Sequence, residues 1–397
     1  MSRPFRRKVL YIPGFDPIPP RRYRELFRKE SPVQAAISDY RMELVRPLHK
    51  AAFGWQTRGS FPEGEAETQF EVLVWADLVQ DSMRRGIAGT YMQLFSTAWA
   101  YIGTGALFQL MKLRRGPVLA ALYPIVVLLL QALVGLILAG LAGWILTKLT
   151  LWWIGLPVAL AVFWGMLSGF RRIDNRLFAY YLMHDYAFTA QHRGAYPAEL
   201  EQRLAQFGDR VSQALSEDVD EVLVVGHSSG AYLAVSLLAD LLRAKPLPEK
   251  GPALALLSLG HVVPMASFLP KADRLREDLA FLSENETIFW LDVTAPGDAC
   301  CFGLCDPVAV SGMAGPDQRW PLVISAAFRQ TLSPEMQKSL RWRWFRLHFQ
   351  YLCAFDRPGD YDYFAITAGP LKLSKRFADR HPSPARITRP VGPGRRT

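Results

Sequence analysis

The chain has 397 residues, half of them hydrophobic, and carries a formal net charge of +10 at pH 7. This composition supplies enough apolar side chains for a sizeable core in one or two domains. The excess of cations is compatible with nucleic acid, but the long apolar runs favour anionic lipid, so we expect no nucleic-acid partner. The cysteines are too few and too clustered for a disulfide framework and form no C-x-x-C zinc pair; they are Cys300, Cys301, Cys305 and Cys353. We therefore predict reduced thiols and no metal site, while the oligomeric state stays open.

The first ninety residues predict strands around one surface helix. The basic N-terminus is followed by an apolar run, residues 9–12, which suits a strand but is too short for the apolar region of a signal peptide. We therefore expect no cleaved export signal. A proline-rich loop over 13–17 and a charged helix over 21–40 follow. Residues 42–45 and 70–75 predict two more strands, with glycine-marked turns of a hairpin between them.

The composition then changes to that of a membrane segment, which we assign to residues 90–176. Residues 91–111 are moderately apolar and aromatic and predict an interfacial or re-entrant helix, with a third membrane span as the alternative. Residues 118–146 and 151–170 contain no charged side chain, and each run reaches the ~20 residues that a helix needs to cross the hydrocarbon core. We therefore predict a two-helix transmembrane hairpin.

Basic residues around this hairpin predict its orientation. Six cations flank the hairpin on its two long sides, namely Lys112, Arg114, Arg115, Arg171, Arg172 and Arg176. The short connection carries Lys148 alone and gathers tryptophans, as a membrane interface does (Trp144, Trp152 and Trp153). By the positive-inside rule both long flanks are cytoplasmic. We therefore expect an integral membrane protein whose remaining domain faces the cytoplasm.

A strand–turn–helix segment after the membrane insertion carries the strongest motif in the chain. Residues 180–215 predict one or two helices, a β-branched run follows from Glu221, and a helix with apolar residues at helical spacing runs over 231–243. Between them, Gly226-His227-Ser228-Ser229-Gly230 fits G-x-S-x-G, where two glycines allow a turn too tight for a Cβ atom. Such a turn presents the Ser228 hydroxyl above the sheet as a nucleophile. The alternative is an ordinary glycine-rich turn with a helix-capping serine.

The remaining chain alternates strands with a helix. Residues 253–260 and 287–293 predict apolar strands, and residues 271–282 predict a charged amphipathic helix between them. This alternation is typical of a largely parallel sheet. Residues 341–351 are aromatic and basic. Residues 372–397 carry eight Lys or Arg against one Asp, and we expect them to form a mobile tail attracted to acidic surfaces.

On these residues the chain resembles the α/β-hydrolases, and among them the serine lipases and esterases. The resemblance rests on the G-x-S-x-G turn and covers residues 9–79 and about 180–369. It implies a mostly parallel sheet flanked by helices, divided by the membrane insertion into residues 1–89 and 177–370, with a basic flexible tail over 371–397. It also implies a catalytic triad in the chain order Ser, Asp or Glu, His, so the partners of the nucleophile should follow it.

The general base implied by this order is His348. A serine hydroxyl needs a base near neutral pH, and imidazole is the usual one. Three histidines follow Ser228, of which His261 comes too early for the order and His381 lies in the tail. His348 stands in Leu347-His348-Phe349-Gln350-Tyr351, which resembles the H-x-x-Y stretches that carry the base in many lipases. The alternative is a partly buried histidine in an aromatic segment.

The acid implied by the resemblance is Asp298. It lies just past the strand 287–293, where lipases of this kind keep the carboxylate that orients the histidine and stabilises its charged form. Asp306, before Pro307, and Asp292, within the strand, are the alternatives. An Asp in a turn rich in Gly and Pro also has a purely structural use as a turn residue.

Two backbone amides are predicted to hold the oxyanion. An oxyanion hole needs two donors aimed at the developing negative oxygen, and one should be the N–H of Ser229, the residue after the nucleophile. Pro13-Gly14-Phe15 resembles the His-Gly-Phe/Leu form of the second loop, so the N–H of Phe15 is the other candidate. Pro13 departs from the family's His, and a proline-rich turn without a chemical role is the alternative.

Together these residues predict a membrane-anchored serine hydrolase that cleaves a lipid or acyl ester. Ser228 would attack the carbonyl, His348 would relay the proton, and Asp298 would orient His348. Water would then release the acyl group, without a metal or cofactor. An acyltransferase or thioesterase with the same triad is the alternative among enzymes. The alternative from another class is a catalytically silent membrane scaffold that binds acidic lipid or a partner through its basic surfaces.

Overall fold

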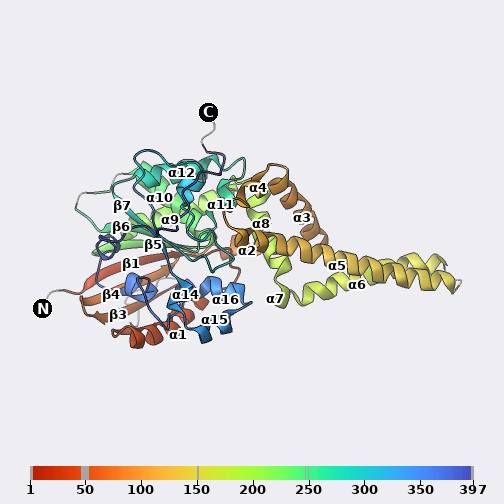
Figure 1. Ribbon diagram of the computed structural model, residues 1–397, viewed down its shortest axis with the longest axis horizontal. Helices are drawn as coiled ribbons and strands as arrows, with labels where there is room; N and C mark the ends of the chain where they lie inside the picture. The colour runs from red at the N-terminus through yellow and green to blue at the C-terminus, as the bar shows by residue number, and fades with distance from the viewer. Residues whose placement is uncertain (1–2, 46–52, 150–151, 246, 249, 395–397) are drawn as a thin grey trace.

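The computed structural model shows a mixed α/β fold and describes residues 3–45, 53–149, 152–245, 247–248 and 250–394. Eight strands form one sheet in the order β2-β3-β4-β1-β5-β6-β7-β8 (Figure 1). β3 runs antiparallel to β2 and β4, and the other neighbouring pairs are parallel. The strands are β1 (Phe5–Ile12), β2 (Arg41–Val45), β3 (Gly54–Phe61), β4 (Gly64–Val72), β5 (Glu221–His227), β6 (Ala253–Leu259), β7 (Ile288–Thr294) and β8 (Leu322–Ser325). The mostly parallel sheet that the sequence predicts is therefore confirmed.

Alternating side chains of the central strands build two cores, one on each face of the sheet. Val9 and Tyr11 of β1 belong to one core, and Leu10 and Ile12 belong to the other. Successive side chains of a strand point to opposite faces, and parallel strands need cover on both. Helices α9 (Ala198–Ala214), α10 (Ser229–Ala244) and α12 (Asp273–Glu284) cover one face, and α1 (Arg21–Ile37), α15 (Pro334–Leu340) and α17 (Tyr363–Ala368) cover the other (Figure 1).

β1 lies in the middle of the sheet, between β4 and β5, and a buried ion pair fixes its junction with β5. Arg7 Nε donates to Glu221 Oε2 at 2.7 Å, and both side chains are buried. Arg7 Nη1 also donates to the carbonyl oxygen of Gly369 at 2.7 Å, and the Leu373 amide donates to Glu221 Oε1 at 2.7 Å. Because buried charges need partners, these contacts tie β1, β5 and the C-terminal region together.

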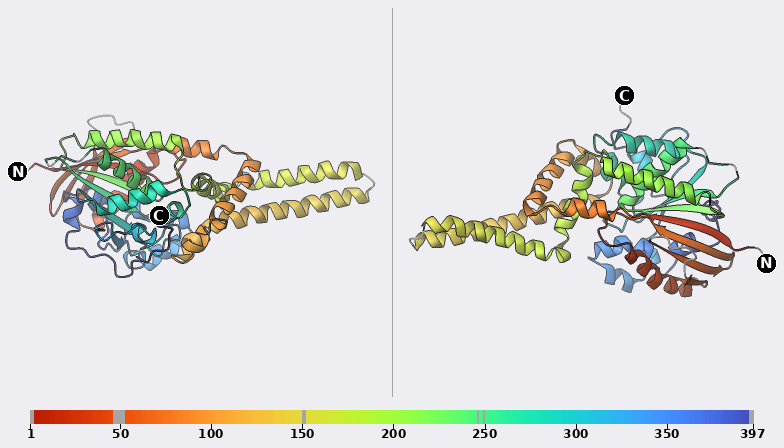
Figure 2. Two further views of the ribbon diagram at one scale, coloured as in Figure 1. Left: turned by 90° about the horizontal axis from the view of Figure 1, so that it is seen from above. Right: turned by 180° about the vertical axis from the view of Figure 1, so that it is seen from behind.

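Two long helices project from the side of this sheet domain (Figures 1 and 2). They are α5 (Arg115–Lys148) and α6 (Trp152–Arg172), and they pack against each other. Gly143 and Gly155 permit close packing, because a Cβ on either would lie 3.3 to 3.4 Å from the carbonyl oxygen of the other. Both helices are long and apolar enough to cross a membrane.

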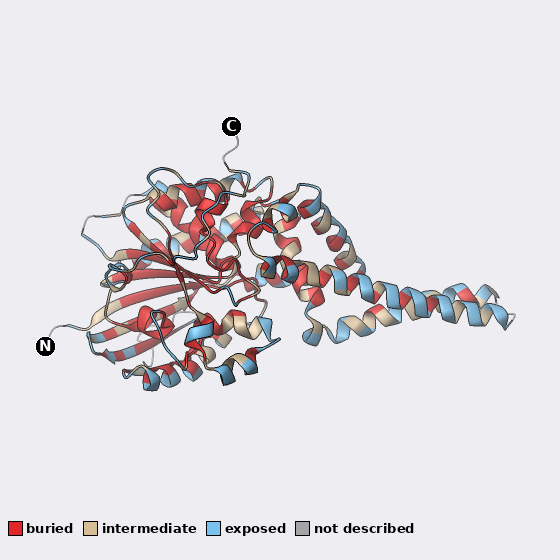
Figure 3. Ribbon diagram, in the orientation of Figure 1, coloured by how far each residue is buried: buried red, intermediate tan, exposed pale blue. Residues whose placement is uncertain are grey.

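The two predicted spans correspond to these two helices. Residues 118–146 fall within α5, and residues 151–170 fall within α6 except for Leu151, which lies outside the described residues. Beyond Leu128 most residues of α5 are not buried (Figure 3), and the buried ones are Gln131, Gly135 and Ala139. Many large apolar side chains are exposed there, among them Leu129, Leu130, Leu133, Leu136, Ile137, Leu141 and Trp144. This outer part, residues 129–148, is about 30 Å long, which is the thickness of the hydrocarbon core of a membrane.

The segment predicted as an interfacial or re-entrant helix forms two helices, α3 (Ile87–Ile102) and α4 (Ala106–Leu110). α3 has 16 residues, fewer than the ~20 that a span needs, and packs along α8 (Ala179–Ala190). The Tyr91 hydroxyl donates to the carbonyl oxygen of Leu128 at 2.9 Å, so α3 also lies against α5 where its outer part begins. α3 is therefore not among the described helices that are long and apolar enough to cross a membrane, and the third-span alternative has no support.

The C-terminal segment, predicted as a flexible tail over 371–397, is instead bound to the domain over its described residues. The Ile387 amide donates to the carbonyl oxygen of Leu304 at 2.7 Å, and the Asp306 amide donates to the carbonyl oxygen of Ile387 at 2.9 Å. The Val391 amide likewise donates to the carbonyl oxygen of Val310 at 3.1 Å. The prediction failed because it counted side-chain charge, whereas backbone hydrogen bonds hold this segment.

The sequence also gave no signal for β8 or for several short helices. β8 has four residues and runs parallel to β7 at the edge of the sheet. The short helical segments are α2 (Ala76–Met83), α7 (Asp174–Leu177), α11 (Val263–Ser267), α13 (Pro307–Val310), α14 (Phe328–Thr331), α16 (Trp344–His348), η1 (Phe349–Leu352) and α18 (Leu373–Arg376). Such elements are too short to show a periodic pattern.

Candidate active site

The turn between β5 and α10 holds Ser228 in a strained conformation. Ser228 has φ 57° and ψ −122°, a region that residues other than glycine rarely adopt. A Cβ on Gly226 would lie 2.6 Å from the carbonyl oxygen of Gly230, and a Cβ on Gly230 would overlap the carbonyl oxygen of Ile12. The two glycines thus let α10 start directly behind Ser228 and against β1. This strand–turn–helix geometry is the one that the G-x-S-x-G motif predicts.

His348 and Asp298 form a close buried pair. His348 ends α16, Asp298 lies in the loop after β7, and His348 Nδ1 is 2.7 Å from Asp298 Oδ2. The Tyr351 hydroxyl donates to the same oxygen at 3.2 Å, and the Cys300 amide donates to Oδ1 at 2.9 Å. Burial opposes a charge on Asp298, but the neighbouring His348 and the hydrogen bonds from it and from the Cys300 amide outweigh burial and lower the pKa of the carboxyl. Asp298 is therefore ionised at neutral pH beside Nδ1.

Ser228 and His348 line one cavity, and Asp298 lies behind His348. His348 Nε2 is buried and has no hydrogen-bond partner among the described residues. Because Nδ1 faces Asp298, Nε2 is the nitrogen that can take a proton from a group in the cavity. The structure thus brings the three predicted triad residues to one site.

His227, which precedes the nucleophile, packs against His348. The two rings lie 4.7 Å apart between centroids, and His227 Nε2 donates to the carbonyl oxygen of His348 at 3.1 Å. Burial and the neighbouring His348 lower the pKa of His227 to about 3, so His227 is neutral at physiological pH. We interpret His227 as a residue that positions His348. His227 occupies the first variable position of G-x-S-x-G, so the motif did not predict this role.

The loop after β1 lies against the nucleophile turn. A Cβ on Gly14 would lie 2.9 Å from Ser228 Cβ, so the approach of the two backbones requires glycine. Both residues predicted to supply oxyanion donors, Phe15 and Ser229, lie at this contact. Ser229 is the first residue of α10, so its amide has no acceptor within the helix. The Phe15 amide donates to Ser229 Oγ at 3.1 Å, a contact that the sequence did not predict.

The carbonyl oxygen of Pro13 helps to hold this loop in place. The Trp75 indole donates to the Pro13 carbonyl oxygen at 2.9 Å. The Tyr181 hydroxyl donates to the Phe15 carbonyl oxygen. The loop is therefore fixed by two side chains from elsewhere in the chain, although it lacks the usual His.

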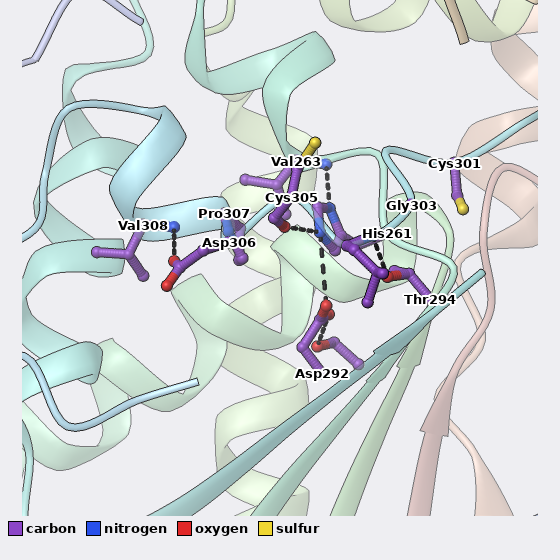
Figure 4. Close-up of polar contacts among 12 residues, drawn as sticks. His261, Val263, Asp292, Thr294, Cys301, Gly303, Cys305, Asp306, Pro307 and Val308 are labelled. Carbon is purple, nitrogen blue, oxygen red and sulfur yellow. Dashed lines mark hydrogen bonds and ion pairs between the residues drawn. The ribbon is translucent and has the colours of Figure 1, made fainter. Parts of the chain in front are cut away.

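Asp306, one alternative acid, caps a helix (Figure 4). Its Oδ1 accepts hydrogen bonds from the amides of Val308 and Ala309, both at 3.0 Å. Its Oδ2 accepts from Gln318 Nε2 at 3.0 Å. These contacts use both carboxylate oxygens for local structure, and none of them involves His348.

His261 and Asp292 form a second buried pair, but its imidazole has no free nitrogen (Figure 4). His261 Nε2 lies 2.9 Å from the Cys305 carbonyl oxygen and 3.6 Å from Asp292 Oδ2. Its Nδ1 accepts from the Val263 amide at 3.3 Å. Burial lowers the pKa of His261 to about 4, so the ring stays neutral. We interpret this pair as structural.

Helices α3, α5 and α8 supply part of the wall of the cavity at Ser228. Tyr101 of α3, Pro117 and Ala120 of α5, and Asp185 of α8 all line it. α5 therefore starts at this cavity and continues outward to pack against α6. Asp185 was missed in the sequence, although it is the one carboxylate in a helix that is otherwise mostly apolar and aromatic.

We expect Asp185→Asn to stabilise the protein at alkaline pH. Burial raises the pKa of Asp185 to about 7, and His348 only partly offsets this. An unfolded carboxyl has a pKa of about 3.9, so the unfolded chain loses its proton first and wild-type stability falls as pH rises from about 4 to about 7. The amide cannot ionise, so the variant should be up to about 4 kcal/mol more stable than wild type at pH 8 and differ little at pH 4. Thermal unfolding in detergent measures this, with Asp209→Asn at an exposed position as the control; an equal effect at both pH values contradicts the prediction.

Asp298, Cys300 and His348 offer ligand atoms within 4.8 Å of one another, close enough to hold a metal. However, burial and the charge of Asp298 raise the pKa of the Cys300 thiol well above its ordinary value, and the thiolate is the form that binds metals. The other two ligand atoms already contact each other in the His348–Asp298 pair. The cluster therefore fits proton transfer better than metal binding.

Comparisons of the chain with protein families, with curated proteins and with solved structures found no match. What the site does is therefore inferred from its own geometry.

Proposed function

We propose that the protein is a membrane-anchored serine hydrolase of the α/β-hydrolase class that acts on a carboxylic ester. One observation carries the proposal: His348 lines the same cavity as Ser228 and contacts Asp298 through its other nitrogen at 2.7 Å. The strained turn at Ser228 and the unpartnered Nε2 of His348 support it.

In the proposed reaction the Ser228 oxygen attacks the ester carbonyl carbon while its proton passes to Nε2 of His348. Asp298 stabilises the imidazolium that forms, and the amide of Ser229 binds the oxyanion. The Phe15 amide becomes the second donor when it exchanges its hydrogen bond to Ser229 Oγ for one to the oxyanion. The ester C–O bond then breaks, the leaving alcohol takes the proton from His348, and the acyl group stays on Ser228. Water attacks this acyl-enzyme by the same route and releases a carboxylic acid.

Labelling with a fluorophosphonate tests this proposal. The probe phosphonylates an activated serine and therefore reports the nucleophile without the natural substrate. We expect the folded full-length protein in detergent to be labelled and the heat-denatured protein to remain unlabelled. A folded protein that is not labelled would support the silent scaffold. Release of free acid from a test ester separates a hydrolase from an acyltransferase.

We further propose that α5 and α6 cross a membrane and that the catalytic domain lies on its cytoplasmic side. Exposed cations stand just before or at the start of α5 and at or after the end of α6, at Lys112, Arg115, Arg171, Arg172 and Arg176. The exposed residues Arg341, Trp342 and Arg343 precede Trp344, whose ring lies 6.0 Å from that of Tyr123 on α5. Basic and aromatic side chains are typical of the cytoplasmic interface of a membrane, so they support this placement.

Reporter fusions should reveal the orientation. Alkaline phosphatase is active only after export from the cytoplasm, so a fusion after Lys148 should be active and a fusion after Arg176 should be inactive. The physical reason is the charge difference between the long flanks and the short connection. The reverse pattern would place the catalytic domain outside the cytoplasm, and activity at neither site would mean that the hairpin does not cross the membrane.

A further inference from the structure

Among the residues that the structure describes, the wall of the cavity at Ser228 holds two carboxylates and no Lys or Arg. One carboxylate, Asp16, already has a cation, because Arg22 Nη1 donates to Asp16 Oδ2 at 2.8 Å. The other, Asp185 on α8, has no hydrogen bond and no ion pair with any described part of the chain. Asp185 is half-buried and lines the cavity, so a molecule in the cavity can reach it. The wall therefore lacks one positive charge.

The tyrosines that line the cavity with Asp185 do not supply a partner for it. The Tyr101 hydroxyl donates to the carbonyl oxygen of Met265 at 2.9 Å. The Tyr181 hydroxyl donates to the carbonyl oxygen of Phe15. A tyrosine has one hydroxyl proton to donate, so neither has a proton left for the carboxylate. Because an ionised group held away from bulk water needs a partner, Asp185 requires one from outside the chain.

Aromatic rings form much of the rest of the wall, and they favour an organic cation as this partner. The face of an aromatic ring carries a negative potential that attracts cations, and such walls recognise ammonium groups with alkyl substituents. The cavity has a volume of about 80 Å³, several times the space that one water needs, so it holds a compact group of this kind. The aromatic lining includes Tyr101, Tyr181, Tyr186, Tyr232, Trp344 and Phe345.

A metal ion is a poorer partner for Asp185. Zinc and the divalent cations that prefer oxygen need several ligands around them. The described side chains form one group of three or more such ligands, Asp298, Cys300 and His348, and Asp185 is not part of it. Asp185 therefore offers a single carboxylate, which suits an ammonium group better than a metal.

Asp185 also lies near the groups that would react. It lines the same cavity as Ser228 and His348. The charge of His348 partly offsets the effect of burial on the Asp185 pKa, so the imidazole and the carboxyl act on each other electrostatically. A cation bound at Asp185 is therefore held beside an ester that Ser228 attacks.

We propose that the substrate carries a compact ammonium group and that Asp185 binds this group while Ser228 attacks the ester carbonyl carbon. This inference rests on the proposed hydrolase function and adds the charge of the substrate and the residue that recognises it. The ammonium group supplies the positive charge that the wall lacks, and the aromatic rings replace its water. A neutral ester of the same shape leaves the carboxylate unpaired and binds less well.

Binding of tetramethylammonium tests the site without any reaction. Measurements at pH 8 keep most of Asp185 ionised, since burial raises the pKa of Asp185 to about 7. We expect saturating tetramethylammonium chloride to raise the Tm of the wild-type protein in detergent by at least ~2 °C over an equal concentration of sodium chloride. Asp185→Asn should lose this shift, and Asp209→Asn, at an exposed position of α9, should keep it.

Two pairs of esters test the substrate, because the members of each pair differ only in a quaternary nitrogen or carbon atom. The charge lies in the alcohol half of 2-(trimethylammonio)ethyl acetate, which is compared with 3,3-dimethylbutyl acetate. It lies in the acyl half of p-nitrophenyl 4-(trimethylammonio)butanoate, which is compared with p-nitrophenyl 5,5-dimethylhexanoate. In at least one pair we expect the wild-type protein to prefer the cationic ester by at least ~10-fold in kcat/KM, and Asp185→Asn to abolish the preference.

The outcomes separate this inference from the function on which it rests. A Tm shift that is absent from the wild-type protein or persists in Asp185→Asn overturns the site. Equal kcat/KM within both pairs overturns the ammonium group of the substrate, while the hydrolysis itself still supports the hydrolase. Wild-type protein that hydrolyses none of the esters and resists the fluorophosphonate overturns the hydrolase, and the Tm shift then still reports the site. Asp185→Asn should be the more stable protein at pH 8, so loss of its Tm shift does not reflect loss of its fold.

Discussion

Ser228→Ala should lower kcat for ester hydrolysis by about 10,000-fold or more and should remove fluorophosphonate labelling. A methyl group cannot attack a carbonyl carbon, and His348 then has no hydroxyl to activate. The variant should keep its fold, because Ala and Ser bear the same strain at φ 57°. Steady-state hydrolysis of p-nitrophenyl acetate by protein in detergent measures the loss.

Ser236→Ala is the matched control for this variant. Ser236 lies on the same helix, α10, is buried, and has its Oγ 3.0 Å from the Tyr196 hydroxyl oxygen. Its loss removes one hydrogen bond, worth about 1 kcal/mol of stability, and neither Ser236 nor Tyr196 lines the cavity at Ser228. Labelling of Ser228→Ala at the wild-type level, or equal losses in the two variants, would show that Ser228 is not the nucleophile.

Asp298→Asn should lower kcat by roughly 100- to 10,000-fold while the protein stays folded. Asn keeps the shape of Asp and an oxygen for the Cys300 amide, but it presents N–H groups where Asp298 Oδ2 meets His348 Nδ1. An amide donor at Nδ1 favours the tautomer that carries its proton on Nε2, and this tautomer cannot accept the proton of Ser228. Single-turnover hydrolysis isolates this step from product release.

Asp306→Asn tests the same substitution at the alternative acid. Asp306 caps α13, and Asn is about as good a helix cap, so hydrolysis should stay within about threefold of wild type. If Asp306→Asn is the inactive variant and Asp298→Asn is active, the assignment of the acid is reversed. Thermal unfolding of both variants checks that neither loss of activity reflects a loss of fold.

Some strands and helices could be predicted from the sequence because they are buried along their whole length or carry no charge. Strands β5, β6 and β7 are covered on both faces, so they appear as continuous apolar runs. Helices α5 and α6 appear as runs without charge because their surfaces are apolar nearly all round. The binding of the C-terminal segment to the domain could not be predicted, because the hydrogen bonds of Ile387 and Val391 use backbone groups, which carry no sequence signal.

The candidate site divides in the same way. The turn at Gly226 and Gly230 could be predicted because its close backbone contacts leave no room for a Cβ atom, so both positions must be glycine. The contact of His348 with Asp298 joins residues 50 positions apart, so only the resemblance predicted it. Asp185 lines the cavity from a helix whose partners come from elsewhere in the chain, and being the one carboxylate of that helix does not show which cavity it lines. The same holds for the Phe15 amide, which meets the Ser229 hydroxyl across 214 positions.

The position of β1 between β4 and β5 sets an order of assembly during synthesis. Arg7 on β1 and Glu221 on β5 are 214 positions apart, and the whole hairpin lies between them. At about 5–20 residues per second, β1 waits roughly 10 to 40 s for its neighbour. During that time one edge of β1 is unpaired, and α5 and α6 emerge and can enter a membrane before the sheet closes. The loop at Gly14 therefore meets the turn at Ser228 only after α5 and α6 have been made, and synthesis that stops within these helices leaves a chain that cannot build the site.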